Sequence, residues 1–357
     1  GIPMSLRLAG IGTAVPPHSV PQATSAEWAV RVSGRNGRRR IIPVLFRRAG
    51  VARRHSVVLE GSPVRQTFFH AATSEDDGGP GTAARMERYR RAAPGLALEA
   101  ARLALRRAGA SPPPTHLVTV SCTGFGAPGF DVSLIRDLGL APTTPRVHVG
   151  FMGCHGAFNG LRVARALVES EPRARVLLCA VELCSLHYDY GDTADRVVAN
   201  ALFSDGAAAL IASADAGAWR LAAQGSCVFP GTEDLMTGAV GDHGFRMGLS
   251  PAIPDALATH LRPWLEAWLA DAGIPLERVA SWAVHPGGPR ILDAVVTALD
   301  LDPRAMDDAR AVLRRYGNMS SPTVLFLIDR LRRRGAPLPC VALGFGPGLT
   351  AEAALFV

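Results

Sequence analysis

The stretch RVHVGFMGCHGAFNGLRVARALVES (residues 146–170) joins an apolar run to a helical pattern through a turn that carries Cys154. Residues 146–151 are typical of a buried strand, and the apolar residues from Ala157 to Val168 recur at the spacing of one helix face. We therefore expect Cys154 to lie where a strand ends and a helix begins. Backbone N–H groups at such a point stabilise an anion, which predicts a lowered thiol pKa, although most cysteines are simply packed as small apolar residues.

The same alternation of strand and helix runs through the rest of the chain and favours an α/β fold. In the first half, apolar runs at 6–15, 115–122, 175–183 and 207–213 predict strands, and 97–110 predicts a helix. The second half restarts with a strand-like run at 219–228 and ends with two more at 340–345 and 351–357. The halves resemble one plan used twice, so we predict two parts, 1–214 and 215–357.

The composition excludes several chemistries. The net charge is +7, and every basic residue other than histidine is arginine, since the 357 residues contain no lysine. Schiff-base enzymes and P-loop nucleotide hydrolases need a lysine amine and are therefore excluded. The six cysteines are scattered without CxxC pairs or metal-ligand spacing, so we expect neither a disulfide framework nor a metal site.

The charge and the hydropathy pattern bear on partners and location. The arginines gather in short clusters such as 35–40, 46–55 and 330–335, which are usually solvated surfaces but also suit an anionic partner. A nucleic-acid-binding protein is an alternative, but no RNA-binding signature or zinc finger accompanies the clusters. No apolar run reaches membrane-spanning length and the start lacks a signal-peptide layout, so we expect a cytoplasmic protein without a membrane partner.

Two further residues occupy strand-to-helix junctions. His285 ends the strand-like run SWAV (281–284), and Asn318 opens the turn before the helical run 323–335. Taken singly, each fits an ordinary structural role, a turn histidine or a capping asparagine. Together with Cys154 they match acyl transfer, in which a thiolate attacks a thioester and N–H donors hold the oxyanion. A papain-like protease uses the same three residue types, but its CGSCW-type signature is absent.

The motifs around this trio resemble those of type III polyketide synthases, the chalcone-synthase-like branch of the thiolase superfamily. The matching motifs occur in the family's order over nearly the whole chain: SCTGFGAPGFD (121–131), GCHGAFNGLR (153–162), ALFSDGAAALI (201–211), HPGGPRILD (285–293), YGNMSSPTVLFLID (316–329) and GFGPGLTAE (344–352). The resemblance implies a duplicated, thiolase-like fold with αβαβα layers. It also implies a homodimer that uses malonyl-CoA and an acyl-CoA starter, with no cofactor, metal or nucleic acid.

The resemblance implies a role for each matching residue. Cys154 would carry the acyl chain, and His285 and Asn318 would hold the malonyl thioester carbonyl, with His285 also keeping Cys154 ionised as an imidazolium partner. Phe203 and Phe245 match a phenylalanine pair between the CoA tunnel and the cavity. Further residues that would shape the cavity are Cys122, Ser320, Gly346, Pro347 and Gly348. The arginines that would bind the CoA phosphates are Arg48, Arg53 and Arg54.

The predicted reaction is decarboxylative Claisen condensation of malonyl-CoA onto a starter held by Cys154, followed by cyclisation to an aromatic or pyrone product. The catalytic trio also fits an enzyme of the KAS III type that makes a single condensation, and this stays the alternative. GFGPG (344–348) close to the C-terminus, together with NMSS (318–321), favours the polyketide synthase. Cys122 is either a second reactive thiol or a small wall residue of the cavity.

Overall fold

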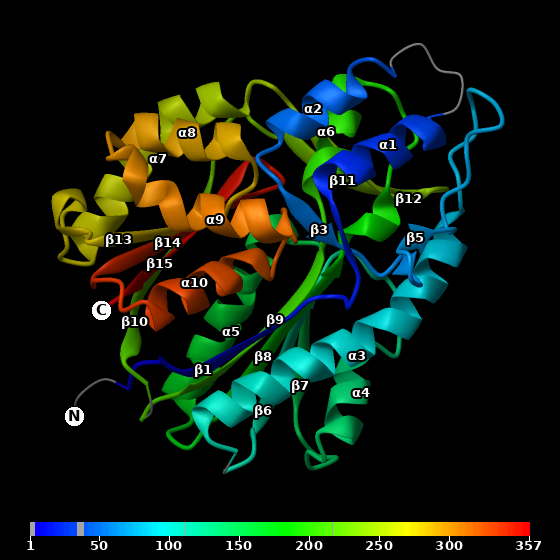
Figure 1. The fold of residues 1–357 in the computed structure, drawn as a ribbon. Coiled ribbons are helices and arrows are strands. Elements are labelled where there is room, and N and C mark those ends of the chain that lie inside the picture. The colour runs from blue at the N-terminus through cyan, green and yellow to red at the C-terminus, as the bar shows by residue number, and fades with distance from the viewer. Residues whose placement is uncertain (1–3, 34–38, 111, 216) are drawn as a thin grey trace.

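The computed structural model describes residues 4–33, 39–110, 112–215 and 217–357. A nine-stranded sheet runs through the molecule, with helices packed against both of its faces (Figure 1). The order of its strands is β13-β14-β15-β10-β1-β9-β8-β6-β7. The predicted α/β class is therefore confirmed.

The described strands form this sheet and three short antiparallel pairs. They are β1 (Arg7–Ala14), β2 (Ser19–Pro21), β3 (Arg53–His55), β4 (Leu59–Glu60), β5 (Arg65–Gln66), β6 (His116–Ser121), β7 (Arg146–Gly150), β8 (Val176–Leu183), β9 (Asp205–Ser213), β10 (Trp219–Val228), β11 (Met236–Gly241), β12 (Gly244–Leu249), β13 (Ser281–Val284), β14 (Cys340–Gly346) and β15 (Thr350–Phe356). The pairs outside the large sheet are β2–β3, β4–β5 and β11–β12.

The helices are α1 (Gln22–Val32), α2 (Ile42–Arg48), α3 (Thr82–Ala108), α4 (Phe130–Asp137), α5 (Gly156–Ser170), α6 (Ala194–Leu202), α7 (Ile253–Asp271), α8 (Pro289–Leu299), α9 (Asp307–Tyr316) and α10 (Thr323–Arg333). Short 3-10 turns are η1 (Gly153–His155), η2 (Cys184–His187), η3 (Leu276–Arg278) and η4 (Pro303–Met306). Helix α3 begins 15 residues before the predicted helix at 97–110, because its first turns are rich in arginine and have no continuous apolar pattern.

Two groups of strands meet at the middle of the sheet. Strand β1 pairs with β9 over most of its length, but with β10 only at Arg7↔Arg220 and Leu8↔Trp219. The first group is β1, β9, β8, β6 and β7, and the second is β10, β15, β14 and β13. The division near Ala214 stays a prediction, since the two groups form one continuous sheet.

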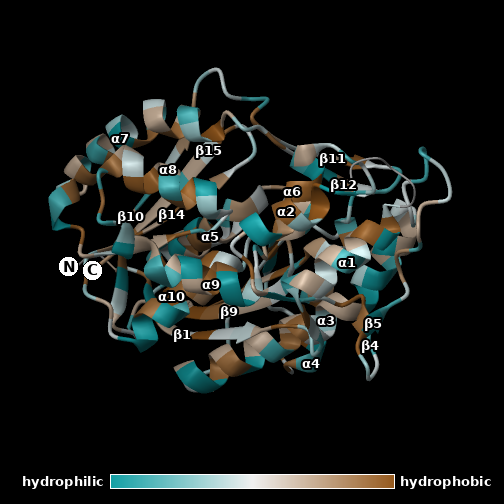
Figure 2. Cartoon of the chain, turned by 45° about the horizontal axis from the view of Figure 1, so that its top comes forward, coloured by the Kyte–Doolittle hydropathy of each residue, from teal (hydrophilic) through white to brown (hydrophobic). Residues whose placement is uncertain are grey.

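The strands are buried on both faces, which explains their uninterrupted apolar sequences. In β8, Val176, Leu178 and Ala180 pack into one core cluster, together with α5 and α10. The intervening Leu177 and Cys179 pack into a second cluster that contains α3. Figure 2 shows hydrophobic ribbon along β9 and mixed hydrophobic and hydrophilic turns on the outer helices α3 and α7.

The helices complete the expected layers. Helices α3 and α4 cover the outer face of the first group of strands, and α7 and α8 cover the second group. Helices α5 and α10 lie between the groups and share one core cluster with both. The order is therefore α–β–α–β–α, with both central helices beginning near the middle of the molecule, where the candidate site residues gather. Among the described residues, no helix is both long enough and apolar enough to cross a lipid bilayer.

The close packing of β1 on α3 gives a test of the fold. A Cβ at Gly12 would lie 2.2 Å from the carbonyl oxygen of Ala100 and 2.4 Å from the backbone nitrogen of Ala104. We expect Gly12→Ala to lower the free energy of unfolding by at least about 3 kcal/mol, because two backbones would have to separate. Urea unfolding monitored by circular dichroism measures this.

The matched control is Gly95→Ala, since a Cβ at this position of α3 meets no atom within 4 Å. There the substitution removes backbone freedom from the unfolded chain and should raise stability by up to about 1 kcal/mol. Equal effects of the two substitutions would contradict the packing of β1 on α3.

Candidate active site

The predicted nucleophile lies between a strand and a helix, as expected. Strand β7 ends at Gly150, and Cys154 sits in η1, immediately before α5. Its side chain is buried, with 5% of the residue exposed. Gly153 has a φ of +82°, and a Cβ there would lie 2.4 Å from Cδ of Pro347. A glycine is therefore required for the GFGPG turn to approach the cysteine.

The structure brings Asn318 to Cys154 from the other half of the chain. The side chains of Ser320 and Asn318 lie beside the Cys154 thiol, where they partly offset the rise in its pKa that burial causes. The Asn318 amide is oriented by its own contacts, since Oδ1 accepts from the Ser320 backbone N–H at 2.8 Å and Nδ2 donates to the Gly287 carbonyl at 3.3 Å. Thus one amide links the nucleophile to the loop that follows His285.

His285 directly follows β13 and is 2% exposed. Its backbone N–H donates to the Leu343 carbonyl, but neither ring nitrogen has a hydrogen-bond partner within the described residues. Leaving a buried polar group unpaired costs about 1–3 kcal/mol, and native proteins rarely do so without a functional reason. The unpaired imidazole is therefore a candidate contact for a bound substrate.

The electrostatics of the pair differ from the expectation. Burial raises the pKa of the Cys154 thiol to about 11 and lowers the pKa of the His285 imidazole to about 3. The predicted lowering of the thiol pKa and the predicted imidazolium are therefore wrong for the unliganded site. Loss of hydration outweighs the start of α5, because a charged thiolate would be buried without an adjacent cation. The resting pair is a thiol and a neutral imidazole.

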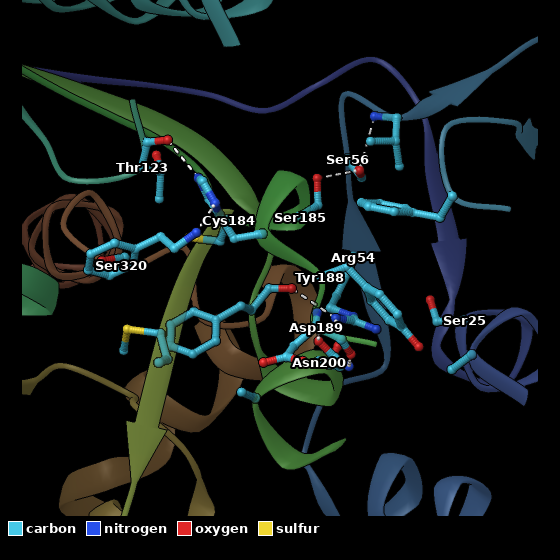
Figure 3. A pocket seen from close by; sticks show the side chains of 18 of the residues that line it. Ser25, Arg54, Ser56, Thr123, Cys184, Ser185, Tyr188, Asp189, Asn200 and Ser320 are labelled. Atoms are coloured by element: carbon cyan, nitrogen blue, oxygen red, sulfur yellow. Dashed lines mark hydrogen bonds between the residues drawn. The ribbon is translucent and has the colours of Figure 1, made fainter. Parts of the chain in front are cut away.

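A single cavity connects most of the predicted site residues. It is lined by Cys154, Cys122, Phe203, Phe245, Ser320 and Pro347, and Figure 3 shows its wall around Ser320 and Cys184. His285, Asn318, Gly346 and Gly348 are not among its lining residues. Gly346 lies against His155, where a Cβ would approach the ring within 2.5 Å. The cavity therefore combines the nucleophile with both predicted phenylalanines.

The three arginines predicted to bind CoA lie in different surroundings. Arg54 is directed into the protein, where its guanidinium donates to the carbonyls of Asn200 and Phe203 and to Oε1 of Gln22. Arg53 is exposed and donates to Oγ of Ser19, and Arg48 is exposed at the end of α2. Arg54 therefore holds the backbone at Phe203, and a CoA contact stays a prediction for all three arginines.

Glu182 organises the floor of the cavity, a role that the sequence did not reveal. Its buried carboxylate accepts from the backbone N–H groups of Cys122 and Thr123 and from the hydroxyls of Thr123 and Ser321. Ser321 belongs to the second half of the chain, so this carboxylate joins the halves beside the nucleophile. Burial and the nearby Glu182 charge raise the pKa of the Cys122 thiol well above its usual value, which favours the wall role for Cys122.

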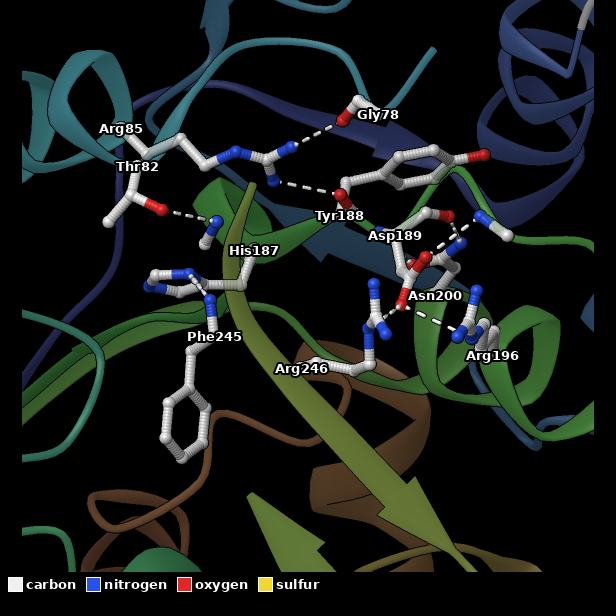
Figure 4. Close-up of polar contacts among 12 residues, drawn as sticks. Gly78, Thr82, Arg85, His187, Tyr188, Asp189, Arg196, Asn200, Phe245 and Arg246 are labelled. Carbon is white, nitrogen blue, oxygen red and sulfur yellow. Dashed lines mark hydrogen bonds and ion pairs between the residues drawn. The ribbon is translucent and has the colours of Figure 1, made fainter. Parts of the chain in front are cut away.

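His187 and Arg85 fix the opposite wall (Figure 4). The His187 Nε2–H donates to the Thr123 carbonyl at 2.6 Å, and Nδ1 accepts from the Phe245 backbone N–H at 2.8 Å. Burial lowers the pKa of this imidazole to about 4, which keeps Nδ1 free to accept. His187 is thus a positioning residue that attaches Phe245, on the β11–β12 hairpin, to the cavity.

Arg85 of α3 is fully buried and pairs with carbonyl groups. It donates to the backbone oxygens of four residues: Gly78, Pro80, Leu186 and Tyr188. Its guanidinium also lies 5.4 Å from the centre of the Phe69 ring. The segment around η2, which supplies Cys184, His187 and Tyr188 to the cavity, is therefore held from behind. Within the described ranges, no group of three or more His, Cys, Asp or Glu side chains is arranged to hold a metal ion.

Comparisons with known proteins cover nearly the whole chain. The family model for the N-terminal domain of chalcone and stilbene synthases matches residues 5–216, and the model for the C-terminal domain matches residues 220–357. An alpha-pyrone synthesis polyketide synthase-like protein of Mycobacterium tuberculosis is 30% identical and covers 97% of this chain and 90% of its own. The 1,3,6,8-tetrahydroxynaphthalene synthase of Streptomyces peucetius subsp. caesius is 35% identical, with 97% and 91% covered.

Solved structures give the same result for the fold. The crystal structure of PKS-I from the brown alga Ectocarpus siliculosus superposes with a TM-score of 0.92 at 28% identity, covering 99% of this chain and 98% of that one. The 1,3,6,8-tetrahydroxynaphthalene synthase of Streptomyces coelicolor A3(2) superposes with a TM-score of 0.85 at 29% identity, with 99% and 98% covered.

The protonation state of Cys154 can be measured by alkylation. Because only the thiolate reacts, a thiol pKa of about 11 predicts an iodoacetamide rate at Cys154 that rises about tenfold per pH unit between about pH 7 and pH 10. Mass spectrometry of the Cys154 peptide gives the rate, and N-acetylcysteine, which should level off near its pKa of about 8.5, is the control. A rate that is already constant above about pH 7 would show a thiolate in the resting enzyme.

The support that Arg85 gives to the cavity wall predicts a stability effect. Arg85→Met keeps most of the side-chain volume but removes the donors to four buried carbonyls, so the free energy of unfolding should fall by at least about 3 kcal/mol. Thermal unfolding measures the loss. The control is Arg90→Met, since Arg90 is exposed on the same helix and, within the described ranges, its guanidinium forms hydrogen bonds to Glu87 alone. If both variants unfolded at the wild-type temperature, the hydrogen bonds of Arg85 would not contribute to stability.

Proposed function

The chain belongs to the chalcone and stilbene synthase family and is a type III polyketide synthase, and from this we propose that Cys154 carries the starter while His285 and Asn318 bind the malonyl thioester. As a member of this class of acyltransferases it condenses malonyl-CoA with an acyl-CoA starter and cyclises the product. The relatives favour this reaction over the single condensation of a KAS III-like enzyme. The assignment of the residues is supported by the Asn318 side chain beside the Cys154 thiol, and by its hydrogen bond to the Gly287 carbonyl, two residues after the buried and unpaired His285.

Loading of the starter begins from two neutral groups. We propose that His285 accepts the proton of the Cys154 thiol, because its ring nitrogens have no hydrogen-bond partner among the described residues. As Sγ of Cys154 attacks the thioester carbon, its proton moves to the imidazole. The negative oxyanion of the substrate and the positive imidazolium therefore form together, and the buried site stays neutral overall. The C–S bond to CoA then breaks, and the imidazolium returns the proton to the departing CoA thiolate.

Extension then uses the same groups as hydrogen-bond donors. The malonyl thioester oxygen accepts from Nδ2 of Asn318 and from an N–H of His285. Loss of carbon dioxide leaves an enolate whose negative charge lies on that oxygen, where each donor is worth about 3 kcal/mol. The enolate carbon attacks the carbonyl of the acyl-Cys154 thioester, and the Cys154 sulfur leaves as thiolate. Before the next extension this thiolate attacks the lengthened CoA thioester, so the chain returns to Cys154 and CoA is released.

We propose that this chemistry uses no metal and no redox cofactor. Every step transfers a proton, an acyl group or carbon dioxide, and none changes an oxidation state that a cofactor would have to balance. CoA carries three negatively charged phosphate groups, two in its diphosphate and one on the ribose, so the exposed Arg48 and Arg53 are the favoured contacts, whereas Arg54 supports Phe203. No nucleic acid or membrane takes part in the proposed reaction.

A homodimer is proposed from the edge of the sheet. Strand β7 pairs only with β6 among the described strands, and its neighbours Phe151 and Met152 are 56% and 39% exposed. An unpaired edge beside exposed apolar side chains suits pairing with a second copy. A cytoplasmic location is proposed because three free thiols, Cys122, Cys154 and Cys184, line the cavity and need a reducing compartment.

Substitutions can separate the two roles assigned to the trio. With malonyl-CoA and starter, Cys154→Ala should form no polyketide, yet it should still convert malonyl-CoA to acetyl-CoA, because decarboxylation needs only the oxyanion donors. Asn318→Ala should lose at least about 100-fold in decarboxylation as well. Liquid chromatography with mass spectrometry follows both products.

The matched control is Cys227→Ala, which removes a free cysteine outside the cavity and should keep both activities. Polyketide formation by Cys154→Ala would contradict the nucleophile assignment. Unchanged decarboxylation by Asn318→Ala would contradict the oxyanion assignment.

A further inference from the structure

The cavity continues past the reaction centre to helix α1. Four of its lining residues, Ser25, Trp28, Ala29 and Val32, follow the spacing i, i+3, i+4, i+7 and so share one face of α1. Leu59 and Phe69 line the same cavity from the segment after β3. We call the space lined by these six residues the α1 lobe. Figure 3 shows Ser25 on the far side of the cavity from Ser320, with Arg54 and Tyr188 between them.

The α1 lobe is suited to hydrocarbon. None of its six residues is charged, and their only polar side-chain groups are the Ser25 hydroxyl and the Trp28 indole N–H. The nearby amide of Gln66 is not free to bind a ligand, because it donates to and accepts from the Phe69 backbone at 2.9 Å in each direction. A polar group placed in this lobe would thus lose its water and could gain a partner only at the Ser25 hydroxyl or the Trp28 indole N–H.

The passage between the α1 lobe and Cys154 is polar. Arg54, Ser56 and Ser185 line it. Arg54 uses Nε and Nη1 for contacts within the protein, and in the described part of the chain its Nη2 has no hydrogen-bond partner. This nitrogen therefore offers a donor to an oxygen atom of a bound chain.

The order of these surroundings matches the order of groups in a growing polyketide. The thioester is at Cys154, the keto groups follow it, and the starter forms the far end. Each condensation inserts two carbons between the sulfur and the starter, so the starter moves away from Cys154 while the new carbonyl groups reach the polar passage. The apolar end of the cavity is therefore where the starter's own tail would come to lie.

We propose that the starter is an unbranched aliphatic acyl-CoA of medium length, whose tail occupies the α1 lobe; this rests on the proposed function, with the chain held at Cys154. Each methylene buried there should raise kcat/KM by a factor of about four until the lobe is full. A phenolic starter is disfavoured because its hydroxyl would lie among apolar side chains. Acetyl-CoA and malonyl-CoA as starters would leave the lobe empty.

The test compares starters of different length in the wild type. Acetyl-CoA, hexanoyl-CoA, decanoyl-CoA and 4-hydroxyphenylpropanoyl-CoA are each supplied with labelled malonyl-CoA, and products are quantified by mass spectrometry. We expect kcat/KM to be at least about 100-fold higher with decanoyl-CoA than with acetyl-CoA. A preference for acetyl-CoA or for the phenolic starter would overturn the proposal.

Substitutions on α1 show whether the lobe is responsible. Ser25→Phe places a ring in the lobe and should lower the decanoyl-to-acetyl ratio of kcat/KM at least about tenfold, whereas Trp28→Ala should shift the preference to longer chains. The control, Thr24→Phe, adds the same ring to the same helix outside the cavity lining and should keep the wild-type ratio. An unchanged ratio in Ser25→Phe would refute the lobe assignment.

Failure of the proposed function itself would look different. In that case no starter, acetyl-CoA included, would be extended by the wild type, and acylation of Cys154 would be absent with all four. A wrong lobe assignment leaves extension intact and changes only the order of preference. Circular dichroism of each variant distinguishes a misfolded protein from a specific effect on starter choice.

Discussion

Two backbone hydrogen bonds hold the two halves of the chain together at the reaction centre. The Asn318 N–H donates to the Leu202 carbonyl at 2.8 Å, and the Ser204 N–H donates to the Asn318 carbonyl at 2.9 Å. This bridge fixes the Asn318 amide next to Cys154 and, in the same step, sets Phe203 at the wall of the cavity. The hydroxyl of Ser204 adds a bond to the Tyr316 carbonyl. The bridge acts together with the Asn318 bonds to Gly287 and Ser320 and with the Arg54 bond to the Phe203 carbonyl.

The burial that makes the site selective also sets its resting charge state. Water is excluded from Cys154 and His285, so hydrogen bonds there are strong, but an isolated charge is costly. Glu182 shows what a stable buried carboxylate needs, since it collects donors from backbone and hydroxyl groups on both halves of the chain. The Cys154 thiol has only the Asn318 and Ser320 side chains beside it, and the His285 imidazole has no partner among the described residues, so both remain neutral until substrate arrives. Reactivity is thus coupled to occupancy of the site.

The sequence predicted the features that depend on local pattern. The place of Cys154 between a strand and a helix followed from periodicity alone. The motif resemblance predicted that His285 and Asn318 act together with Cys154. The β11–β12 hairpin was missed because its residues are largely exposed and lack an apolar run. The thiol pKa was predicted in the wrong direction, since burial arises from segments that are distant in sequence. The same reason hid His187 and Arg85, whose contacts include residues 58, 64 and 101 positions apart, and the α1 lobe, which combines α1 with Leu59 and Phe69.

The most direct test of the account is to identify the residue that becomes acylated, because three free thiols share one cavity. The enzyme is incubated with an isotope-labelled acyl-CoA in the absence of malonyl-CoA, quenched in acid and digested, and the label is located by peptide mass spectrometry. We expect a thioester on the Cys154 peptide and none on the peptides of Cys122 and Cys184. The thiols of these two residues are buried and do not have the Asn318 side chain beside them. Label on Cys122 or Cys184 in place of Cys154 would contradict the account.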